Sequence, residues 1–445
     1  MFENTIAAIS TSLQDGAISI IRLSGDQAIE ITQKIFDRNI MNAKSHTIHY
    51  GFIIDQDKNP VDEVLISIFR APKTYTREDI VEINCHGGTF ITRRILSMVL
   101  SVGANLAKPG EFTQRAFYHG RIDLSQAEAV QDMIEASNNT AATMAIHGIK
   151  GSVKKLLQPL IDDLMDIIAQ IEVNIDYPEY DDVEELTASS LLPRSANLLT
   201  KMNKILDDSK NIKLVKEGIK TVIIGRPNVG KSSLLNALLR EDKAIVTNIA
   251  GTTRDIVEGS ISIDGVVLNM IDTAGIRETD DIIESMGVEK SKELIHQADL
   301  VLLVIDGSQS LSSEDMQLLE LTEDATRIIV LNKADQGTKV DLDGIVISAK
   351  DNQISTLTEE IKKMFELGKI IDNNDHILTN ARQTMLLQRA SQALKQAVEA
   401  MEMMIPTDLI VTDLYECWNN LKEILGEKAK EDLLDELFKR FCIGK

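Results

Sequence analysis

The 445-residue sequence has three cysteines, one tryptophan and eight prolines. Cys85, Cys417 and Cys442 lie far apart and form no Cys-x-x-Cys pair, so no disulfide framework is expected and a reducing compartment is favoured. No stretch approaches the roughly 18 apolar residues that a membrane span needs. The first residues lack the basic start and long apolar core of a signal peptide. We therefore expect a cytoplasmic protein without a membrane segment.

Basic side chains are scarce as well. Lys and Arg total 47 against 69 Asp and Glu, which gives a net charge of 47 − 69 = −22. This balance argues against a protein that coats nucleic acid over its whole surface. The excess of acid is uneven, because residues 1–120 carry 12 basic and 13 acidic side chains, or 12 − 13 = −1. The sequence still allows a local basic surface in that region.

The length predicts about three domains, on a prior of roughly 100–200 residues each. Residues 1 to about 120 have the pattern of a mixed α/β domain. Apolar runs at 17–23, 64–69 and 79–84 predict strands, and residues 28–36 predict a helix.

Two stretches of this region are candidates for chemistry. Residues 85–88, Cys-His-Gly-Gly, predict a turn before a helix, and a single Cys-His step lacks the further ligands of a zinc site. Glu82 is predicted inside a strand between apolar neighbours, where its carboxylate faces either a ligand or solvent; the pattern does not decide between them. Residues 109–113 predict another turn.

From Asp123 onward the pattern is helical. Residues 125–128, Ser-Gln-Ala-Glu, fit a capping box, and apolar residues then recur every three or four positions between 157 and 171. The acidic segment around Pro178 is expected to end that helix, and another is expected over 189–208. The simplest interpretation of these stripes is the core of a helical bundle.

Helical stripes return near the end of the chain, over residues 387–404 and 433–441, with Pro406 between them. Because helices flank both sides of residues 214–370, we expect one helical domain that is interrupted by an insert.

The sequence is organised around residues 225–233, Gly-Arg-Pro-Asn-Val-Gly-Lys-Ser-Ser. An apolar run precedes this stretch and a helical pattern follows it, which predicts a strand, a glycine-rich turn and a helix. Backbone N–H groups of such a loop surround a phosphate, aided by the helix N-terminus. Lys231 is expected to reach the β- and γ-phosphates, and the Ser232 hydroxyl to hold Mg²⁺.

Two motifs after this loop fit the same nucleotide. Residues 251–255, Gly-Thr-Thr-Arg-Asp, supply a threonine of the kind that binds Mg²⁺ when the γ-phosphate is present. Residues 272–275, Asp-Thr-Ala-Gly, place a carboxylate at the end of a strand, where it binds Mg²⁺ through water, and the Gly275 N–H can meet the γ-phosphate.

The last two motifs indicate guanine. Residues 332–335, Asn-Lys-Ala-Asp, follow a buried-strand run, and Asp335 can accept from the N1–H and the exocyclic amine that guanine has and adenine lacks. Residues 348–350, Ser-Ala-Lys, can offer a backbone N–H to the guanine O6. Together the motifs favour GTP and argue against a P-loop ATPase.

Hydrolysis of GTP needs a side chain that orients the attacking water, and the usual glutamine is absent from this sequence. Ile276 stands where many small GTPases carry it, and isoleucine cannot orient water. Glu284 is a candidate for that role, although a solvated helix acid is the plainer interpretation. Asn228 can help to bind a monovalent cation in place of an arginine finger.

The whole chain resembles the MnmE (TrmE) family of bacterial tRNA-modifying GTPases. The resemblance rests on the GTPase motifs and on five further stretches, which are residues 81–88, 109–113, 123–129, 380–383 and the terminal Phe-Cys-Ile-Gly-Lys. It implies an N-terminal α+β tetrahydrofolate-binding and dimerisation domain (1–120), a discontinuous helical domain (121–213 and 373–445) and an inserted Ras-like P-loop GTPase domain (214–372).

The resemblance also implies a function. Members use a one-carbon tetrahydrofolate, 5-formyl or methylene, and work with the flavin-dependent partner MnmG in a heterotetramer. Together they add an aminomethyl or carboxymethylaminomethyl group to C5 of the wobble uridine, U34, of certain tRNAs. The matching folate positions are Arg22, Glu82, Arg121 and Lys445, and Cys442 has been thought to assist the chemistry.

In this family the GTPase domains of a homodimer pair face to face in a K⁺-dependent manner. By position, Ser232 and Thr253 would hold Mg²⁺, and Glu284 would orient water through a bridge. The K⁺ ligands would be Asn228, Thr247, Ile249 and Thr252. The full set of positions implied at the nucleotide is Asn228, Val229, Gly230, Lys231, Ser232, Ser233, Thr247, Asn248, Ile249, Ala250, Gly251, Thr252, Thr253, Asp272, Thr273, Ala274, Gly275, Asn332, Lys333, Ala334, Asp335, Ser348, Ala349 and Lys350.

The sequence departs from the family at several positions. Residues 10–15 replace a loop rich in proline and glycine, Arg121 stands where lysine is frequent, and Val229 replaces a commoner alanine. The rival interpretation is a regulatory GTPase switch, of the ribosome-assembly type, without covalent chemistry. Such a switch needs neither the terminal motif nor a folate pocket. We expect the near-neutral N-terminal region to supply part of the tRNA surface.

Overall fold

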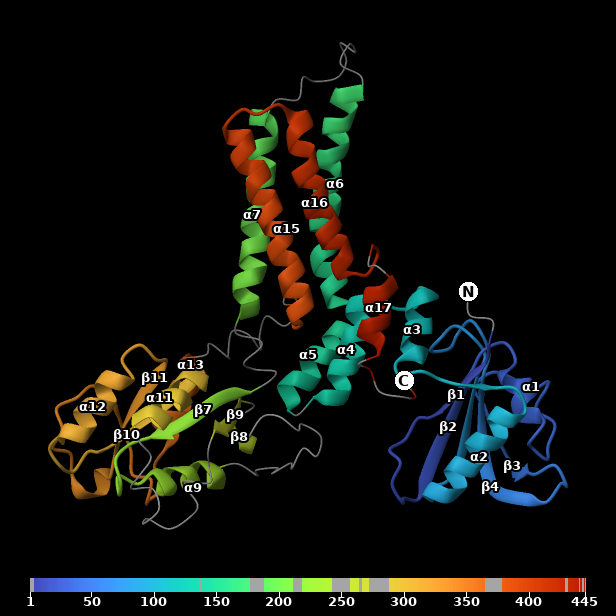
Figure 1. Ribbon diagram of the computed structural model, residues 1–445, viewed down its shortest axis with the longest axis horizontal. Coiled ribbons are helices and arrows are strands. Elements are labelled where there is room, and N and C mark those ends of the chain that lie inside the picture. Colours follow the sequence, from blue (N-terminus) through green and yellow to red (C-terminus); the bar gives the residue numbers. More distant parts are fainter. Residues whose placement is uncertain are drawn as a thin grey trace. The chain divides into compact units, whose positions relative to one another are not determined.

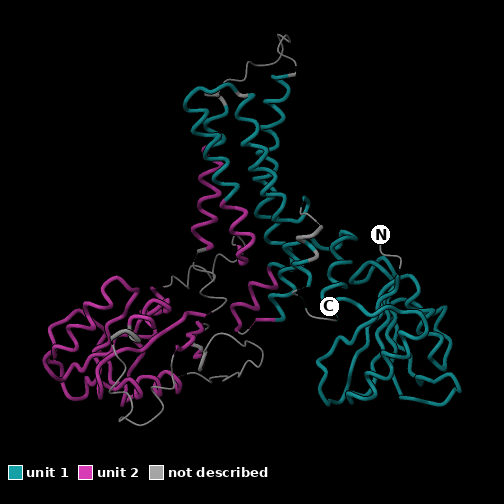
Figure 2. Tube along the Cα trace, in the orientation of Figure 1, with its two compact units in different colours: residues 1–134, 148–195, 389–445 teal, residues 135–147, 196–388 magenta. Residues whose placement is uncertain are grey.

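The computed structural model describes residues 4–136, 138–176, 188–210, 218–241, 257–263, 266–271, 288–364, 378–428, 431–439, 441 and 444. The chain divides into two compact units (Figure 2). Unit 1 comprises Met1–Ile134, Gly148–Ser195 and Arg389–Lys445, and unit 2 comprises Glu135–His147 and Ala196–Gln388. No helix in these ranges combines the length and the apolar character that a membrane crossing requires.

Six of the described strands in unit 1 form a sheet in the order β3-β4-β5-β2-β1-β6. The strands are β1 (Ile6–Ile9), β2 (Ile18–Ser24), β3 (Thr47–Ile54), β4 (Pro60–Phe69), β5 (Ile80–His86) and β6 (Asn105–Leu106). Neighbours are antiparallel except β1 and β6. The three predicted strands are thus confirmed as β2, β4 and β5, while β1, β3 and β6 were not predicted.

Two helices, α1 (Ala28–Gln33) and α2 (Thr89–Ser101), cover one face of this sheet (Figure 1). Their buried residues form one core with the inward-facing residues of the strands, such as Ile21, Leu23 and Ile83. Because side chains alternate along a strand, Arg22 and its cross-strand partner Glu82 point to the other face.

Three local predictions in this region are corrected. The predicted turn at 85–88 begins later, because Cys85 and His86 still pair with β2. The predicted turn at 109–113 is helix α3 (Glu111–Tyr118) from Glu111 onward, with Gly110 at φ 68° as its N-cap. Helix α1 ends at Gln33 rather than at residue 36, where Phe36 bridges to Ile53.

The helical part contains α4 (Leu124–Glu135), α5 (Asn139–Ile149), α6 (Ser152–Asp176), α7 (Ala188–Lys210), α15 (Ala381–Glu402), α16 (Thr407–Ile424) and α17 (Glu431–Phe438). The predicted stripe in α6 is confirmed, since Leu157, Leu164 and Ile168 are at most 1% exposed. Met404 is wrong as a member of the α15 stripe, because it lies beyond the helix and is 83% exposed.

The N-cap of α4 lies two residues before the predicted capping box. Asp123 Oδ1 accepts from Gln126 N at 2.9 Å, and Gln126 Oε1 accepts from Asp123 N at 3.0 Å. This is the reciprocal arrangement of a capping box, formed by Asp and Gln instead of the predicted Ser125 and Glu128.

Six of the described strands in unit 2 form a second sheet, in the order β12-β11-β10-β7-β9-β8. They are β7 (Ile219–Ile224), β8 (Val257–Ile263), β9 (Val266–Ile271), β10 (Leu300–Asp306), β11 (Arg327–Asn332) and β12 (Ile345–Val346). Every neighbouring pair among these is parallel except β8 and β9. The carboxyl ends of β7, β10, β11 and β12 therefore meet at one edge of the sheet.

The described helices of this α/β part are α9 (Lys231–Glu241), α11 (Val288–Gln297), α12 (Ser313–Leu321), the short 3₁₀ helix η2 (Ala334–Gln336) and α13 (Ser355–Met364). Apolar residues of α9 and α13 share a buried core with β7, β9 and β10, including Leu234, Leu268 and Leu357. The buried-strand runs predicted near residues 300 and 328 are confirmed as β10 and β11.

Candidate functional site

The predicted phosphate loop joins β7 to α9 in unit 2, as the sequence pattern requires. Asn228 and Gly230 adopt positive φ angles of 63° and 97°. A Cβ atom on Gly230 would lie 2.3 Å from Asn332 Nδ2, so glycine is required there. Lys231 Nζ donates to the carbonyl oxygens of Gly225, at 2.7 Å, and Arg226, at 2.9 Å. These contacts hold the ammonium group over the loop.

Asn332, at the end of β11, joins the phosphate loop to the guanine-reading segment. It is 2% exposed. Its Nδ2 donates to Val229 O at 2.9 Å, and its Oδ1 accepts from Ala349 N at 3.1 Å. This side chain therefore connects the loop that would hold phosphates with the loop that would hold the base.

Two side chains of the guanine motif are held from neighbouring loops. Ser348 Oγ lies 3.2 Å from Asp335 Oδ1 and 2.9 Å from Asp351 Oδ2. Lys333, at φ 68°, donates to Asp306 Oδ2 at 2.8 Å. Burial alone would raise the pKa of Asp306, but the hydrogen bonds from Lys333 and Ser308 lower it below its ordinary value.

An ion pair that the sequence analysis missed ties the phosphate loop to α12. Arg226 Nε lies 3.3 Å from Asp315 Oδ2, and the Asp315 side chain is 2% exposed. The same carboxylate accepts from the Ser312 backbone N–H in the capping box of α12. The Ser-x-x-Asp spacing at residues 312–315 was the available signal, although it does not reveal the arginine.

Several predicted site residues lie outside the described residues. They are Thr247, Asn248, Ile249, Ala250, Gly251, Thr252, Thr253, Asp272, Thr273, Ala274, Gly275, Glu284, Cys442 and Lys445. Of the implied Mg²⁺ ligands only Ser232, in the first turn of α9, is described, and of the implied K⁺ ligands only Asn228. Asn228 is exposed on the loop, where its side chain is accessible to an ion.

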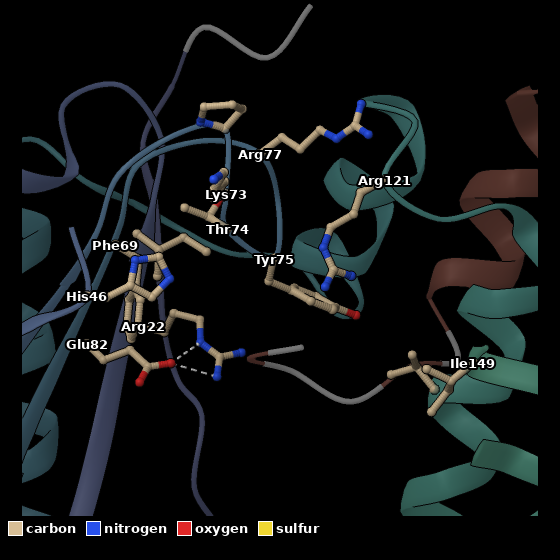
Figure 3. Close-up of a pocket in the computed structure, with 13 residues that line it drawn as sticks. Arg22, His46, Phe69, Lys73, Thr74, Tyr75, Arg77, Glu82, Arg121 and Ile149 are labelled. Carbon is tan, nitrogen blue, oxygen red and sulfur yellow. Dashed lines mark hydrogen bonds and ion pairs between the residues drawn. The ribbon is translucent and has the colours of Figure 1, made fainter. Parts of the chain in front are cut away.

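A cavity of about 740 Å³ lies in unit 1, between the open face of the N-terminal sheet and the helical region (Figure 3). Glu82 on β5 and Arg22 on β2 meet on its wall. Arg22 Nε and Nη2 each lie 2.9 Å from Glu82 Oε1. Both side chains are 21% exposed, so the pair is half-buried and accessible from the cavity.

Aromatic and cationic groups form the opposite wall. The guanidinium carbon of Arg121 lies 5.1 Å from the centre of the Tyr75 ring (Figure 3). Tyr75 Oη and Thr113 Oγ1 are 2.9 Å apart. Burial raises the pKa of Tyr75 above its ordinary value, so the phenol stays neutral at physiological pH.

The C-terminal segment reaches the same cavity. Gly444 O accepts from Ser10 Oγ at 3.0 Å and from Arg22 Nη1 at 3.2 Å. Gly444 has φ 90°, and a Cβ atom there would lie 2.4 Å from Ile9 O. Only glycine permits this approach. Arg22 is thus shared between Glu82 and the C-terminal backbone.

A buried ion-pair network holds the loop that carries Tyr75 in place. Arg115 on α3 is 0% exposed; its Nη1 lies 3.0 Å from Glu78 Oε1 and its Nη2 lies 2.9 Å from Glu111 Oε1. Ser24 Oγ adds a hydrogen bond of 2.7 Å to Glu78 Oε2. The sequence analysis missed this network, and only the i, i+4 spacing of Glu111 and Arg115 could have indicated part of it.

Three of the four predicted folate positions, Arg22, Glu82 and Arg121, line this one cavity. The sequence left open whether the Glu82 carboxylate faces a ligand or solvent. In the structure it faces the cavity rather than bulk solvent. Cys85 Sγ lies 3.5 Å from Ser19 O, and His86 Nδ1 lies 2.6 Å from Asp62 Oδ1. Within the described part of the chain, no group of three metal-ligating side chains is found.

Comparison with known proteins gives matches along the chain. A model described as the GTP-binding protein TrmE N-terminus matches residues 5–121, and one described as the MnmE helical domain matches residues 124–442. A tRNA modification GTPase MnmE of Lactococcus lactis subsp. cremoris (strain SK11) is 50% identical over 449 residues, which cover 99% of this chain and 98% of that protein. One from Bacillus anthracis is 48% identical over 455 residues, or 99% of each chain. A solved structure of Aquifex aeolicus Era covers 39% of this chain and 66% of that chain at 24% identity, with a TM-score of 0.25, too low to carry an argument.

Proposed function

The chain belongs to the MnmE family of tRNA modification GTPases, and on this premise we propose that it uses GTP hydrolysis to drive modification of the wobble uridine, U34, of certain tRNAs. The product would carry an aminomethyl or carboxymethylaminomethyl group at C5. The observation that carries the GTPase part is the bridge from Val229 through Asn332 to Ala349, which joins a phosphate loop to a guanine-reading loop.

The proposed roles in the nucleotide site follow from the chemistry of the side chains. Lys231 would transfer its hydrogen bonds from loop carbonyls to β- and γ-phosphate oxygens, a small movement for a flexible ammonium group. Asp335 would accept from the guanine N–H groups, and the Ala349 segment would face O6. Ser232 and Thr253 would hold Mg²⁺, which neutralises charge on the phosphates when bound.

Hydrolysis would depend on a second cation and on a second copy of the chain. We assign Glu284 to the orientation of water, since Ile276 has no polar group for that task. The K⁺ ligands would be Asn228, Thr247, Ile249 and Thr252, completed when the GTPase domains of a homodimer pair. The exposed side chain of Asn228 supports this assignment.

The cavity in unit 1 would bind 5-formyl- or methylene-tetrahydrofolate. A carboxylate such as Glu82 can accept from the adjacent N–H groups of a reduced pterin ring, and Tyr75 offers an aromatic face. Arg121 would pair with anionic parts of the ligand, together with Lys445. Arg22 would contact the ligand beside Glu82 and hold that carboxylate in place. The carbon would come from folate, Cys442 would assist, and the redox step would belong to the flavin-dependent partner MnmG, in a heterotetramer.

Domain spans and place in the cell complete the proposal. We assign residues 1–120 to folate binding and dimerisation, residues 121–213 and 373–445 to one helical domain, and residues 214–372 to the inserted GTPase. The near-neutral charge of residues 1–120 supports a contact with tRNA there. The protein would work in the cytoplasm.

The first test measures GTP hydrolysis in matched KCl and NaCl buffers for the wild type, Glu284→Ala and Asn228→Ala. We expect strong stimulation by K⁺ that either substitution abolishes. Hydrolysis that is indifferent to the cation would refute the K⁺-dependent scheme and favour a plain regulatory switch.

The second test uses folate binding to distinguish a tRNA-modifying enzyme from a regulatory switch. Calorimetric titration with 5-formyltetrahydrofolate should show binding to the wild type and a large loss in Glu82→Gln, because the neutral amide offers one acceptor where the carboxylate offers two. A cavity that binds no folate would support the regulatory GTPase instead.

A further inference from the structure

The cavity in unit 1 has a strongly one-sided charge. Its described lining residues include four cations, Arg22, Lys73, Arg77 and Arg121, and one carboxylate, Glu82. The whole chain carries a net charge of −22, so this concentration of positive charge runs against the overall composition. Like charges on one wall repel each other unless an anion lies between them.

Three of these cations form no ion pair with any described residue. Arg22 is paired with Glu82, but Lys73, Arg77 and Arg121 have no carboxylate partner in the described ranges, and all three are exposed. In Figure 3 Arg77 and Arg121 lie on the side of Tyr75 away from the Arg22–Glu82 pair. Lys73 lies apart from that pair, on the loop that carries Tyr75. We call Lys73, Arg77 and Arg121 the rim cations.

Neutral groups hold two of the rim cations in place. Arg77 Nη1 donates to His119 O at 2.7 Å, and His119 Nδ1 in turn lies 2.6 Å from Thr76 O. Arg121 lies over the Tyr75 ring. A carbonyl or an aromatic face orients a guanidinium group but leaves its charge uncompensated, so the rim keeps its attraction for an anion.

We propose that the rim cations bind the poly-γ-glutamyl tail of a folate, so that the protein prefers polyglutamylated tetrahydrofolate over the monoglutamyl form. This inference rests on the folate function proposed for the same cavity. Each added γ-linked glutamate brings one carboxylate, and carboxylates pair well with lysine and with the planar fork of arginine. The ring would lie on the Glu82 side of Tyr75 and the tail on the rim side.

A carboxylate chain fits this rim better than an RNA backbone does. Backbone recognition of RNA relies on phosphate contacts along an extended positive track. The rim cations come from one loop, residues 73–77, and from Arg121 on the same cavity wall, within a strongly acidic chain. Three charges at the mouth of a ligand cavity match a short anionic extension of that ligand.

The expected effect is moderate, because exposed ion pairs are individually weak. Two added carboxylates facing the rim cations should tighten binding about five- to tenfold, or ~1–1.4 kcal/mol. The gain should shrink as salt is added, since these charges lie in contact with solvent.

The experiment uses the full chain and isothermal titration calorimetry. 5-Formyltetrahydrofolate carrying one or three glutamates is titrated into the wild type, the double variant Lys73→Gln/Arg77→Gln, and Arg93→Gln. Arg93 is an exposed arginine on α2 that does not line the cavity, so it controls for loss of charge on the same domain. We expect the preference for triglutamate in the wild type and in Arg93→Gln, and its loss in the double variant with little change in monoglutamate affinity.

Each outcome decides a different question. If the monoglutamate binds and the triglutamate binds no more tightly, the rim inference is wrong and the folate cavity stands. If neither form binds the wild type, the proposed folate function fails. If the double variant weakens tRNA binding but keeps the preference for triglutamate, the rim serves RNA and the inference is overturned. Should the double variant fail to fold, Lys73→Gln alone, on an exposed side chain, gives the same comparison.

Discussion

Substitution of Asn332 by alanine should weaken guanine-nucleotide binding far more than the loss of a base contact would. The Asn332 side chain touches the backbones of two loops, through Val229 O at 2.9 Å and Ala349 N at 3.1 Å. Alanine removes both hydrogen bonds at once. The phosphate loop and the guanine-reading loop then lose the element that fixes their separation.

The magnitude follows from the burial of the groups left behind. Val229 is 0% exposed and Ala349 is 6% exposed, so water has poor access to the orphaned carbonyl and N–H. An unsatisfied buried polar group costs about 1–3 kcal/mol, which gives ~2–6 kcal/mol for the two. If the free loops relax and let water reach these groups, the cost applies only to the GDP-bound state, and the Kd for GDP should rise about 30-fold or more.

The assay is equilibrium titration with a fluorescent GDP analogue, accompanied by thermal unfolding. Asn332→Asp is the matched variant, because it keeps an acceptor for Ala349 N but places an oxygen opposite Val229 O. We expect it to bind GDP as poorly as alanine does, since the carbonyl and the carboxylate repel. Unchanged GDP affinity in Asn332→Ala, with an unchanged unfolding midpoint, would refute the bridging role.

Three further outcomes are expected. Gly444→Ala should weaken 5-formyltetrahydrofolate binding about tenfold, because it displaces the carbonyl that Arg22 contacts. A calorimetric titration that gives the same Kd as the wild type would contradict this. The hydrogen bond with Asp62 raises the pKa of His86 above its ordinary value. Their pairing therefore stabilises the fold fully at a pH below the ordinary histidine pKa, and this stabilisation is lost as the pH rises through the folded pKa. An NMR titration should show this elevated pKa and its fall in Asp62→Asn. Burial raises the pKa of Cys417 to about 12, and a thiol reagent at pH 8 should therefore modify this residue only after unfolding.

The sequence predicted best what depends on neighbouring residues. Alternation and apolar runs located β2, β5, β10 and β11, and the glycine-rich loop between β7 and α9 follows from local backbone requirements. Errors fell where local patterns compete. Ser125 and Glu128 also fit a capping box, although Asp123 and Gln126 form it. Pro109 and Gly110 predict a turn, although α3 begins at Glu111.

The cavity could not have been assembled from the sequence without the family resemblance. Its walls combine Arg22, Tyr75 and Arg121, which are separated by more than forty residues each, with the backbone of Gly444. No spacing rule relates such positions, because only the strand pairing of β2 with β5 and the packing of α3 bring them together. The resemblance named three of the cavity residues, while Tyr75 and the role of Gly444 emerged from the fold.

The cavity also bears on the choice between a modifying enzyme and a plain switch. A switch would gain nothing from holding Lys73, Arg77 and Arg121 around one cavity, where none of them has a carboxylate partner among the described residues. It would have equally little use for Gly444, whose φ of 90° would strain any other residue and whose carbonyl oxygen accepts a hydrogen bond from Arg22. An anionic ligand in the cavity would compensate the charge of the three cations, while the Gly444 carbonyl would keep Arg22 in place beside the ligand. The two features together therefore favour a bound small molecule in addition to the GTP cycle.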